Sequence, residues 1–306
     1  MIKDKISIIT TFYNTEEYIL QCIHSVNSQI IPDDLDVEYI LVDDCSTDKT
    51  LDLINAYFDK VKNERIEVKI IKLTNNIGVG GAKDFGIKNS TGNYIMFLDS
   101  DDYYINSDFI YRAHKDIKEN DADIVEYGFM TRNKDTYVIE LYKSPKSLII
   151  ENNKIGNMQL MFTEFAIRFV VWNKIIKRSI IESCPYSHSR TFDDIETTPL
   201  WVYNANKILI KNSIEINYRC VFNSILRNNT LDSKYETIKA MSKLFEIFKD
   251  DINILKMIYE RCLYDMESIV NGSSDDEYFR KMSKLNTYML KYIYPDKYKD
   301  ITYDVE

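Results

Sequence analysis

Short apolar runs recur along the first hundred residues of the chain, separated by segments in which apolar positions repeat at helical spacing. The runs occupy residues 5–11, 37–42, 66–73 and 94–98. Their β-branched and aromatic residues are typical of buried strands. The segments between the runs predict helices over residues 15–28, 49–61 and 82–90. Strands that alternate with helices in this way predict an α/β fold with a mostly parallel, doubly wound sheet.

The pattern becomes less regular after residue 104. It predicts a helix, a strand, a second helix, an apolar cluster and a pair of strands around Asn212-Ser213, over residues 109–118, 123–130, 154–167, 169–181 and 208–220. From residue 232 onwards the apolar positions follow helical spacing alone. We therefore expect one domain over residues 1–230, with halves 1–104 and 105–230, and a helical region over residues 231–306.

Polar side chains follow three of the predicted strands at the point where each strand ends. They form the sequences Thr11-Phe12-Tyr13, Asp43-Asp44 and Asp99-Ser100-Asp101-Asp102. Because ligands bind such sheets outside the carboxyl ends of the strands, we expect these side chains to share one edge. The last sequence has three carboxylates in four residues, which suits a hard cation such as Mg²⁺ or Mn²⁺. The alternative is a solvated loop that leads into a helix.

Composition limits the classes of partner and compartment. A net charge of −9 makes free nucleic acid an unfavourable general partner. The five cysteines are scattered without a CxxC pair, so neither a zinc site nor a disulfide framework is expected. The first residues are too polar for a signal peptide, and no apolar run approaches the ~20 residues of a membrane span. We expect a cytoplasmic protein, with peripheral contact at the inner face of the membrane as an alternative.

Several common catalytic motifs are absent. The glycines at 78, 80 and 81 do not have the GxGxxG spacing, and no P-loop or GxSxG sequence occurs. The three histidines are far apart; His188, just before an acidic pair, could reach a phosphate or a metal, but a structural role is the simpler interpretation. Dinucleotide-dependent redox chemistry, P-loop phosphoryl transfer and serine hydrolysis are therefore not indicated.

Several segments, taken in their order, resemble a known family. They are ISIITTFYN, EYILVDDCSTDKT, NNIGVGGAKDFGIKNSTGNYIMFLDSDD and the later pair WNKIIKRSII and FDDIE. Together they are similar to the family 2 glycosyltransferases, which have a GT-A-type fold. The resemblance covers roughly residues 5–227. It implies transfer of a sugar from a nucleotide diphosphate, most simply a UDP-sugar, to an acceptor hydroxyl with inversion at the anomeric carbon.

The resemblance also implies roles for residues of the donor half. Thr11 and Tyr13 would line the nucleoside pocket, with Tyr13 stacked on the base. Asp44 would accept a hydrogen bond from the base, Asp43 would support that loop, and Asn14 belongs to the same donor site.

The diphosphate side of the donor site is implied by a second group of residues. Asp101 would ligate Mg²⁺ or Mn²⁺. Asp99 would lie closer to the ribose or sugar and is the second candidate metal ligand. Ser100, Gly78 and Lys83 complete the implied donor site. Lys83 stands where the family often has arginine, so it would meet a phosphate as a point charge without a bidentate fork.

The acceptor half carries the implied base. Asp194 would take the proton of the acceptor hydroxyl, while Asp193 and Trp172 are candidates for acceptor contact. The alternatives are an acidic helix N-terminus at Asp193 and Asp194, and core packing for Trp172. No QxxRW sequence follows, which indicates a non-processive enzyme.

The resemblance suggests work on a cell-surface polysaccharide or glycolipid. Two other functions stay open at this stage: a sugar-phosphate nucleotidyltransferase and a non-catalytic protein that binds nucleotide sugars. The helical region after residue 230 matches no family, and it either packs on the catalytic domain, forms a homodimer or docks on a membrane surface.

Overall fold

The computed structural model describes residues 3–132, 139–219, 231–270 and 276–298. The chain forms two compact units: Met1–Asn153 with Val170–Val221, and Lys154–Phe169 with Phe222–Glu306. The boundary expected near Thr230 lies outside the described residues, and a domain over residues 1–230 stays a prediction. The segment at residues 154–169 groups with the C-terminal helices, although it belongs to the expected acceptor half.

The first unit is built on one sheet, whose described strands are ten in number. Their bounds are β1 (Asp4–Phe12), β2 (Leu35–Asp43), β3 (Ile66–Lys72), β4 (Tyr94–Phe97), β5 (Tyr103–Tyr104), β6 (Ile124–Arg132), β7 (Ile139–Tyr142), β8 (Leu148–Glu151), β9 (Lys174–Lys177) and β10 (Lys207–Arg219). The order across the sheet is β3-β2-β1-β4-β9-β6-β10-β5, with β7 paired to β6 and β8 paired to β10.

Strands β3, β2, β1 and β4 run parallel to one another, as the alternating pattern predicts. Most side chains of β1, β2 and β4 are buried on both faces, which is typical of a parallel sheet, whereas those of β3, at the edge, are mostly partly buried. The rest of the sheet is mixed: β9 runs antiparallel to both β4 and β6, whereas β10 is parallel to β6. The α/β fold class is thus confirmed, and the parallel character is strongest in the first half.

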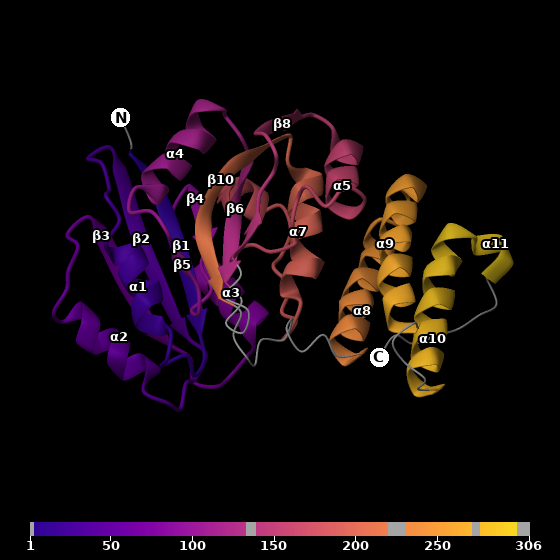
Figure 1. Ribbon diagram of the computed structural model, residues 1–306, viewed down its shortest axis with the longest axis horizontal. Helices are drawn as coiled ribbons and strands as arrows, with labels where there is room; N and C mark the ends of the chain where they lie inside the picture. The colour runs from indigo at the N-terminus through magenta and orange to yellow at the C-terminus, as the bar shows by residue number, and fades with distance from the viewer. Residues whose placement is uncertain (1–2, 133–138, 220–230, 271–275, 299–306) are drawn as a thin grey trace. The chain divides into compact units, whose positions relative to one another are not determined.

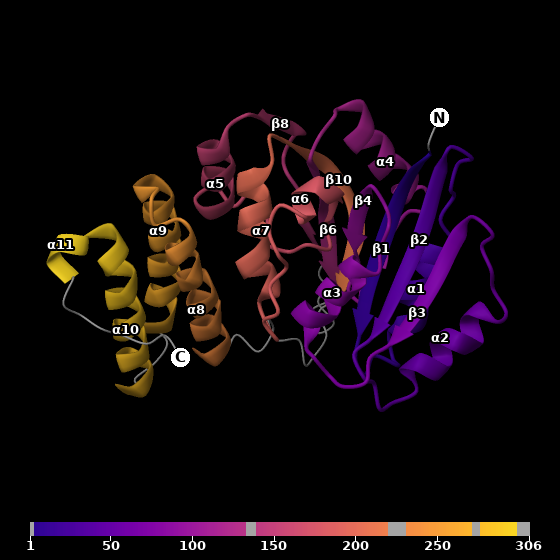
Figure 2. The same ribbon diagram turned by 180° about the vertical axis from the view of Figure 1, so that it is seen from behind.

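Helices cover both faces of this sheet (Figures 1 and 2). One face packs against α1 (Ile19–Asn27), α2 (Thr50–Phe58) and α4 (Phe109–Glu119), whose apolar side chains join the core formed by β1 and β2. The other face carries α3 (Val79–Lys88), α6 (Arg178–Ile181) and α7 (Asp193–Asn204). Trp201 of α7 is fully buried and stacks on Phe97 of β4, with ring centroids 6.3 Å apart.

The sequence-based prediction for residues 208–220 was wrong in part. Lys207–Arg219 form one long strand, β10, rather than two strands around Asn212-Ser213. The pairing of β10 with β6 shifts register between Ile210 and Ile214 and again before Ile216. Such an irregularity bends a strand without ending it, so turn-forming residues at this place do not reverse the chain.

The second unit is helical in its described residues. It contains α5 (Lys154–Phe162), α8 (Leu231–Ile247), α9 (Ile252–Val270), α10 (Asp276–Ile293) and α11 (Pro295–Tyr298). Its core includes Met161 of α5, Phe245 of α8 and Ile258 of α9. The expected helix break at residues 271–274 falls outside the described residues. None of the described helices is both long and apolar enough to cross a membrane.

Candidate active site

The acidic strand ends lie on one edge of the sheet, as the order of the strands requires. Backbone hydrogen bonds to β1 continue for one residue past the ends of β2 and β4. Asp44 N donates to Phe12 O at 2.9 Å, and Leu98 N donates to Ile9 O at 3.1 Å. Because β1 lies between β2 and β4, the segments that start at Asp44 and Asp99 leave the sheet on either side of the end of β1. The expectation of a shared carboxyl edge is confirmed.

The loop after β1 combines an exposed aromatic ring with a fixed backbone. Tyr13 is 48% exposed, which leaves its ring available to stack on a ligand. Asn14 has a positive φ of 54°, and its Oδ1 accepts from the backbone N–H groups of Thr47 at 2.8 Å and Asp48 at 3.2 Å. Asn14 therefore holds the loop after β2 in place. Asn14 is itself exposed, so its expected contact with a donor stays a prediction.

Asp43 and Asp44 are both buried and accept hydrogen bonds from backbone groups. Asp43 Oδ1 accepts from Ser46 N at 2.7 Å. Asp44 Oδ1 and Oδ2 accept from Ile77 N at 2.7 Å and from Gly78 N at 2.9 Å. Each carboxylate oxygen of Asp44 keeps a second lone pair. Asp44 thus joins the end of β2 to the turn before α3, a link that the sequence pattern does not reveal.

The glycines at the start of α3 allow a close approach of another loop. Gly78 has φ 86°, a backbone conformation that other residues rarely adopt. A Cβ on Gly80 would lie 2.4 Å from Ser187 O and 3.0 Å from Asp193 Cβ. The segment before α7 therefore packs directly on the first turn of α3, which brings the acceptor half to the donor half of the same unit.

Lys83 lies at the junction of these two halves. Its Nζ is 3.6 Å from Asp99 Oδ1, beyond β4, and 3.4 Å from Asp193 Oδ2, at the start of α7. The side chain is only 7% exposed. Burial acts to lower the pKa of Lys83, but the charges of Asp193, Asp99 and Asp194 outweigh it and raise that pKa. Lys83 is therefore a buried, charged lysine that links both halves.

The segment after β4 is an acidic cluster. Asp99 is about one third exposed, whereas Ser100 is buried. Burial, and then the charge of Asp99, raise the pKa of Asp101 to about 6. Burial also raises the pKa of Asp102, which is fully buried and leaves Oδ2 without a hydrogen-bond partner. The cluster resists carrying several charges at once.

A divalent cation would relieve this repulsion at Asp99 and Asp101. Among the described residues, no group of three or more His, Cys, Asp or Glu side chains could enclose a metal ion. The protein would therefore supply one or two carboxylates, and ligand oxygens and water would complete the shell. Mg²⁺ typically binds in this manner together with substrate phosphates. The oxygen donors fit a hard cation held jointly by protein and ligand.

Arg219, at the end of β10, donates hydrogen bonds to the acidic cluster. The sequence did not indicate this role. Its backbone N donates to Asp102 Oδ1 at 2.8 Å, and Nη1 donates to Asp101 O at 2.7 Å. The guanidinium lies between the rings of Tyr18 and Tyr103, at 5.3 and 5.0 Å from their centroids. Asp101 and Arg219 are 118 positions apart, and nothing in the spacing of the chain signals their contact.

The acidic pair at the start of α7 has two different environments. Asp193 is 4% exposed and its Oδ2 accepts from the Tyr186 hydroxyl at 2.6 Å. Asp194 Oδ1 accepts from Ile195 N at 2.9 Å. Burial, and then the charge of Asp193, raise the pKa of Asp194 to about 6, against the opposing effect of Lys83. A carboxylate with this pKa is suited to accept a proton near neutral pH.

Two expectations for acceptor contact find no support. Asp193 is buried and engaged by Lys83 and Tyr186, so it has little capacity for a further ligand. Trp172 is 5% exposed and stacks on Tyr218, with ring centroids 5.3 Å apart. Its indole therefore belongs to the core, which is the alternative that the sequence left open.

His188 pairs within the protein. Its Nε2 lies 2.8 Å from Asp84 Oδ2, and Lys88 Nζ lies 2.6 Å from the same oxygen. Asp84 thus faces the loop before α7, and its carboxylate is paired with Lys88 and His188. This arrangement agrees with the structural interpretation of His188.

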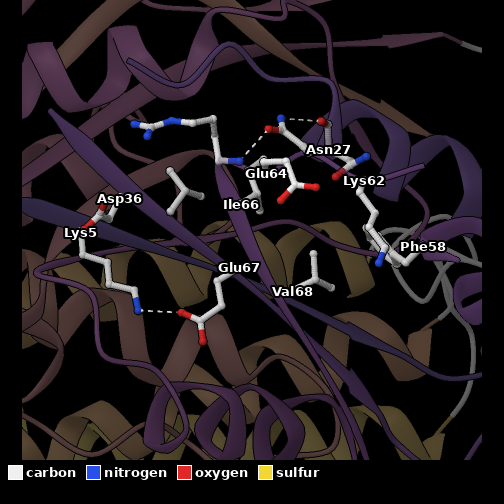
Figure 3. Close-up of a pocket in the computed structure, with 12 residues that line it drawn as sticks. Lys5, Asn27, Asp36, Phe58, Lys62, Glu64, Ile66, Glu67 and Val68 are labelled. Carbon is white, nitrogen blue, oxygen red and sulfur yellow. Dashed lines mark hydrogen bonds and ion pairs between the residues drawn. The ribbon is translucent and has the colours of Figure 1, made fainter. Parts of the chain in front are cut away.

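A hollow of about 460 Å³ lies elsewhere on the sheet (Figure 3). Its walls include Lys5 and Ile66, which stand at the amino ends of β1 and β3, opposite the carboxyl edge. Lys5 Nζ pairs with Glu67 Oε2 at 3.2 Å, and Arg65 Nη2 donates to Pro32 O at 2.6 Å. Because these charged groups are already paired, we place the candidate site at the carboxyl edge despite the size of this hollow.

Comparisons with known proteins agree with this fold. The chain is 25% identical to the glycosyltransferase GlyG of Streptococcus pneumoniae over 272 residues, which are 85% of this chain and 87% of GlyG. Its fold is similar to that of residues 1–349 of Staphylococcus aureus TarS, solved in complex with UDP, with a TM-score of 0.71 at 19% identity over 95% of this chain and 82% of that structure.

A mannosyltransferase from Pyrobaculum calidifontis, PcManGT, solved with GDP-Man and Mn²⁺, has a TM-score of 0.59 at 12% identity and is matched over 98% of this chain and 89% of that one. These likenesses identify the fold as GT-A-type. The family model of glycosyl transferase family 2 matches residues 7–183, more than half of the chain. A chain that has this match, this sheet and acidic residues at this edge belongs to glycosyl transferase family 2 and is a glycosyltransferase.

Proposed function

We propose that the chain is a metal-dependent, inverting glycosyltransferase that takes a UDP-sugar and delivers the sugar to a hydroxyl of a cell-surface polysaccharide or glycolipid. The observation that carries this proposal is the junction at Lys83. The buried ammonium group of Lys83 lies 3.6 Å from Asp99 Oδ1 of the acidic cluster. The same group lies 3.4 Å from Asp193 Oδ2, and Asp193 is next to Asp194 in the chain. A candidate metal ligand and the neighbour of the candidate base therefore contact the same lysine.

The donor would lie along the carboxyl edge of the first half. Tyr13 offers an exposed ring for the base, and Asp44 offers the free lone pairs of its carboxylate to the base N–H. UDP is the proposed nucleotide because TarS, the neighbour with the TM-score of 0.71, was solved with it. Thr11, at the end of β1, would line the same pocket.

The diphosphate needs positive charge because this chain carries a net charge of −9. Asp101, with Asp99, would hold Mg²⁺ or Mn²⁺. Bound there, the cation would neutralise charge that develops on the leaving diphosphate. Lys83 would add a positive charge from the protein, and Ser100 and Gly78 would line the part of the donor site that holds the diphosphate. The Mn²⁺ bound to PcManGT supports a divalent cation in this fold.

Asp194 would act as the general base. A sugar hydroxyl is a weak nucleophile, so a carboxylate must take its proton as it attacks the anomeric carbon. Inversion requires the base and the leaving group to lie on opposite faces of the sugar. Asp194 comes from α7, whereas Asp101 follows β4, so the two come from separate parts of the unit. This separation supports an inverting displacement.

The two other functions considered from the sequence are less favoured. A nucleotidyltransferase has no supporting observation, and the family match favours transfer of a sugar. A purely binding protein would require Asp194 to lie far from the donor side. Instead, the charges of Lys83 and Asp99 both act on the pKa of Asp194, which indicates that it is close to them.

A thermal-shift screen of nucleotides and nucleotide sugars, with Mn²⁺ and with EDTA, tests this proposal. A ligand that binds only the folded state raises the melting temperature. We expect UDP and one UDP-sugar to raise it when Mn²⁺ is present. A rise with a nucleoside triphosphate and a sugar phosphate would favour nucleotidyl transfer instead, and no rise with any nucleotide would contradict a donor site.

Association with other partners is a separate prediction. The C-terminal helices could form a homodimer or contact the inner face of a membrane, and the cytoplasm is the expected compartment. Sedimentation and flotation with anionic vesicles test these associations. A monomer that stays with the soluble fraction would contradict both.

A further inference from the structure

We propose that Tyr186 and Asp193 are positioning residues which, together with Lys83, fix the first turn of α7 and thereby the place of the Asp194 carboxylate. The proposal rests on the function proposed above, because it concerns the base of that reaction. Neither side chain would touch the donor or the acceptor.

The contact between Tyr186 and Asp193 is short and buried. The hydroxyl donates to Asp193 Oδ2 at 2.6 Å, and both residues are 4% exposed. A hydrogen bond to a buried, charged acceptor is roughly twice as strong as one between neutral groups. Since Lys83 Nζ lies 3.4 Å from the same oxygen, one atom of Asp193 is held from two directions.

The ring of Tyr186 is itself fixed by two elements of the unit. Its centroid lies 5.9 Å from Phe97 in β4 and 5.5 Å from Trp201 in α7. Trp201 is fully buried, so the ring rests on rigid core. The hydroxyl therefore has a defined position relative to the end of β4, where the acidic cluster begins.

Two features at the start of α7 are unfavourable and require stabilising contacts. Phe192, immediately before it, has φ 58°, a left-handed conformation that costs a non-glycine residue free energy. Asp193 and Asp194 follow side by side, and like charges at this distance repel each other. Gly80 lets the segment approach α3 so closely that a Cβ there would lie 3.0 Å from Asp193 Cβ. Asp193 is thus the anchor, and Asp194 is the neighbouring side chain that it orients.

The test compares two tyrosine-to-phenylalanine variants. Tyr186→Phe removes only the hydroxyl that Asp193 accepts. Tyr127→Phe is the matched control, because Tyr127 is also buried and donates to a carboxylate, Asp116 Oδ2, at 3.0 Å. UDP release would be followed with Mn²⁺ and each of UDP-glucose, UDP-galactose, UDP-N-acetylglucosamine and UDP-N-acetylgalactosamine. Calorimetry would give the Kd of UDP, and melting curves would check the folding of both variants.

The expected result separates kcat from binding. A displacement of about 1 Å at a reacting group can cost about a hundredfold in rate, so Tyr186→Phe should lower kcat at least tenfold. The KM of the donor and the Kd of UDP should change by less than about twofold, because no donor contact is lost. Tyr127→Phe should leave kcat, KM and Kd unchanged. Asp193→Asn should lower kcat in the same way and also leave UDP binding intact.

Two results would overturn the proposal. Equal kcat values for Tyr186→Phe and Tyr127→Phe would show that the hydroxyl positions nothing. A parallel loss of kcat and UDP binding in Tyr186→Phe would show a general structural role. If the unaltered chain released UDP from no donor and did not bind UDP, the proposed function itself would fail, and the positioning role would fall with it.

Discussion

Lys83 Nζ lies 3.4 Å from Asp193 Oδ2, although the two residues are 110 positions apart in the chain. The lysine belongs to α3 of the donor half, and the aspartate begins α7 of the acceptor half. A buried ion pair is costly to form, and it persists only where the geometry and further hydrogen bonds are good. This pair therefore marks the place where the two halves meet around the candidate site.

Replacement of Asp194 by asparagine should abolish transfer and preserve donor binding. The amide cannot take a proton, and a general base contributes about 10² to 10⁴ in rate. We expect kcat to fall by that factor in a UDP-release assay, while calorimetry gives an unchanged Kd for UDP. Asp52→Asn is the control, because Asp52 is an exposed acidic residue in the first turn of α2. Loss of UDP binding in Asp194→Asn would contradict the assignment.

Replacement of Asp101 by alanine should remove the metal dependence of donor binding. Without this carboxylate, the cation would lose its main contact with the protein. We expect the Kd of UDP with Mn²⁺ to rise until it equals the Kd measured in EDTA. Asp108→Ala, an exposed residue that pairs with Arg112, should bind UDP as the unaltered chain does. A variant that still distinguishes Mn²⁺ from EDTA would show that Asp101 is not a ligand.

The rate should fall as the solution becomes acidic. Burial and the charge of Asp193 raise the pKa of Asp194 to about 6, and only the deprotonated carboxylate can act as a base. At saturating Mn²⁺, the logarithm of kcat/KM should therefore decline below about pH 6. In Asp193→Asn the neighbouring charge is gone, so the decline should move to lower pH. An unchanged profile would mean that the charge of Asp193 does not act on the base.

Stability should depend on Glu38, which lies in β2 far from the carboxyl edge and is fully buried. Burial would raise the pKa of Glu38, but hydrogen bonds from Lys69 and Ser7, with smaller contributions from Thr91 and Lys5, outweigh it and lower that pKa to about 2. A depressed pKa means that the stabilisation is complete above the ordinary value of 4.5 and is lost as the pH falls towards 2.

Urea unfolding would measure this effect. Glu38→Gln should lower the free energy of unfolding at pH 7 by about 3 kcal/mol, the low end for a broken buried pair, since Lys5 and Lys69 are partly solvated. Glu67→Gln, exposed and paired with the same lysines, should cost less than about 1 kcal/mol. At pH 3 the free energies of unfolding of the two variants should differ less than at pH 7. Equal free energies of unfolding at pH 7 would contradict the account.

The sequence predicts the first half of the fold well because each local signal agrees with the tertiary structure. The β-branched runs became β1 to β3, and the acidic segment at Asp99 follows β4 as expected. Polar strand ends in an alternating pattern must meet at one edge, so the place of the site could be inferred as well. The bend within β10 was not foreseen, because Asn212 and Ser213 also favour turns.

The packing of the site could not be inferred from the sequence. Asn14 and Asp44 are expected at a ligand, and the sequence does not reveal that both also accept hydrogen bonds from backbone amides of neighbouring loops. Tyr186 and Arg219 carry no motif, and their roles come from contacts with residues distant in the chain, such as Asp101. Periodicity reveals which face of an element is buried, but it does not reveal which side chains from other elements meet there.

The most direct test of the central claim uses water as the acceptor and an α-linked UDP-sugar as the donor. It measures the anomeric configuration of the free sugar that is released. Proton NMR can follow the product before mutarotation, with Mn²⁺ and with EDTA. If Asp194 activates the nucleophile opposite a leaving group held at Asp101, the first product should be the β anomer and should form only with Mn²⁺. An α product, or equal turnover in EDTA, would contradict the account.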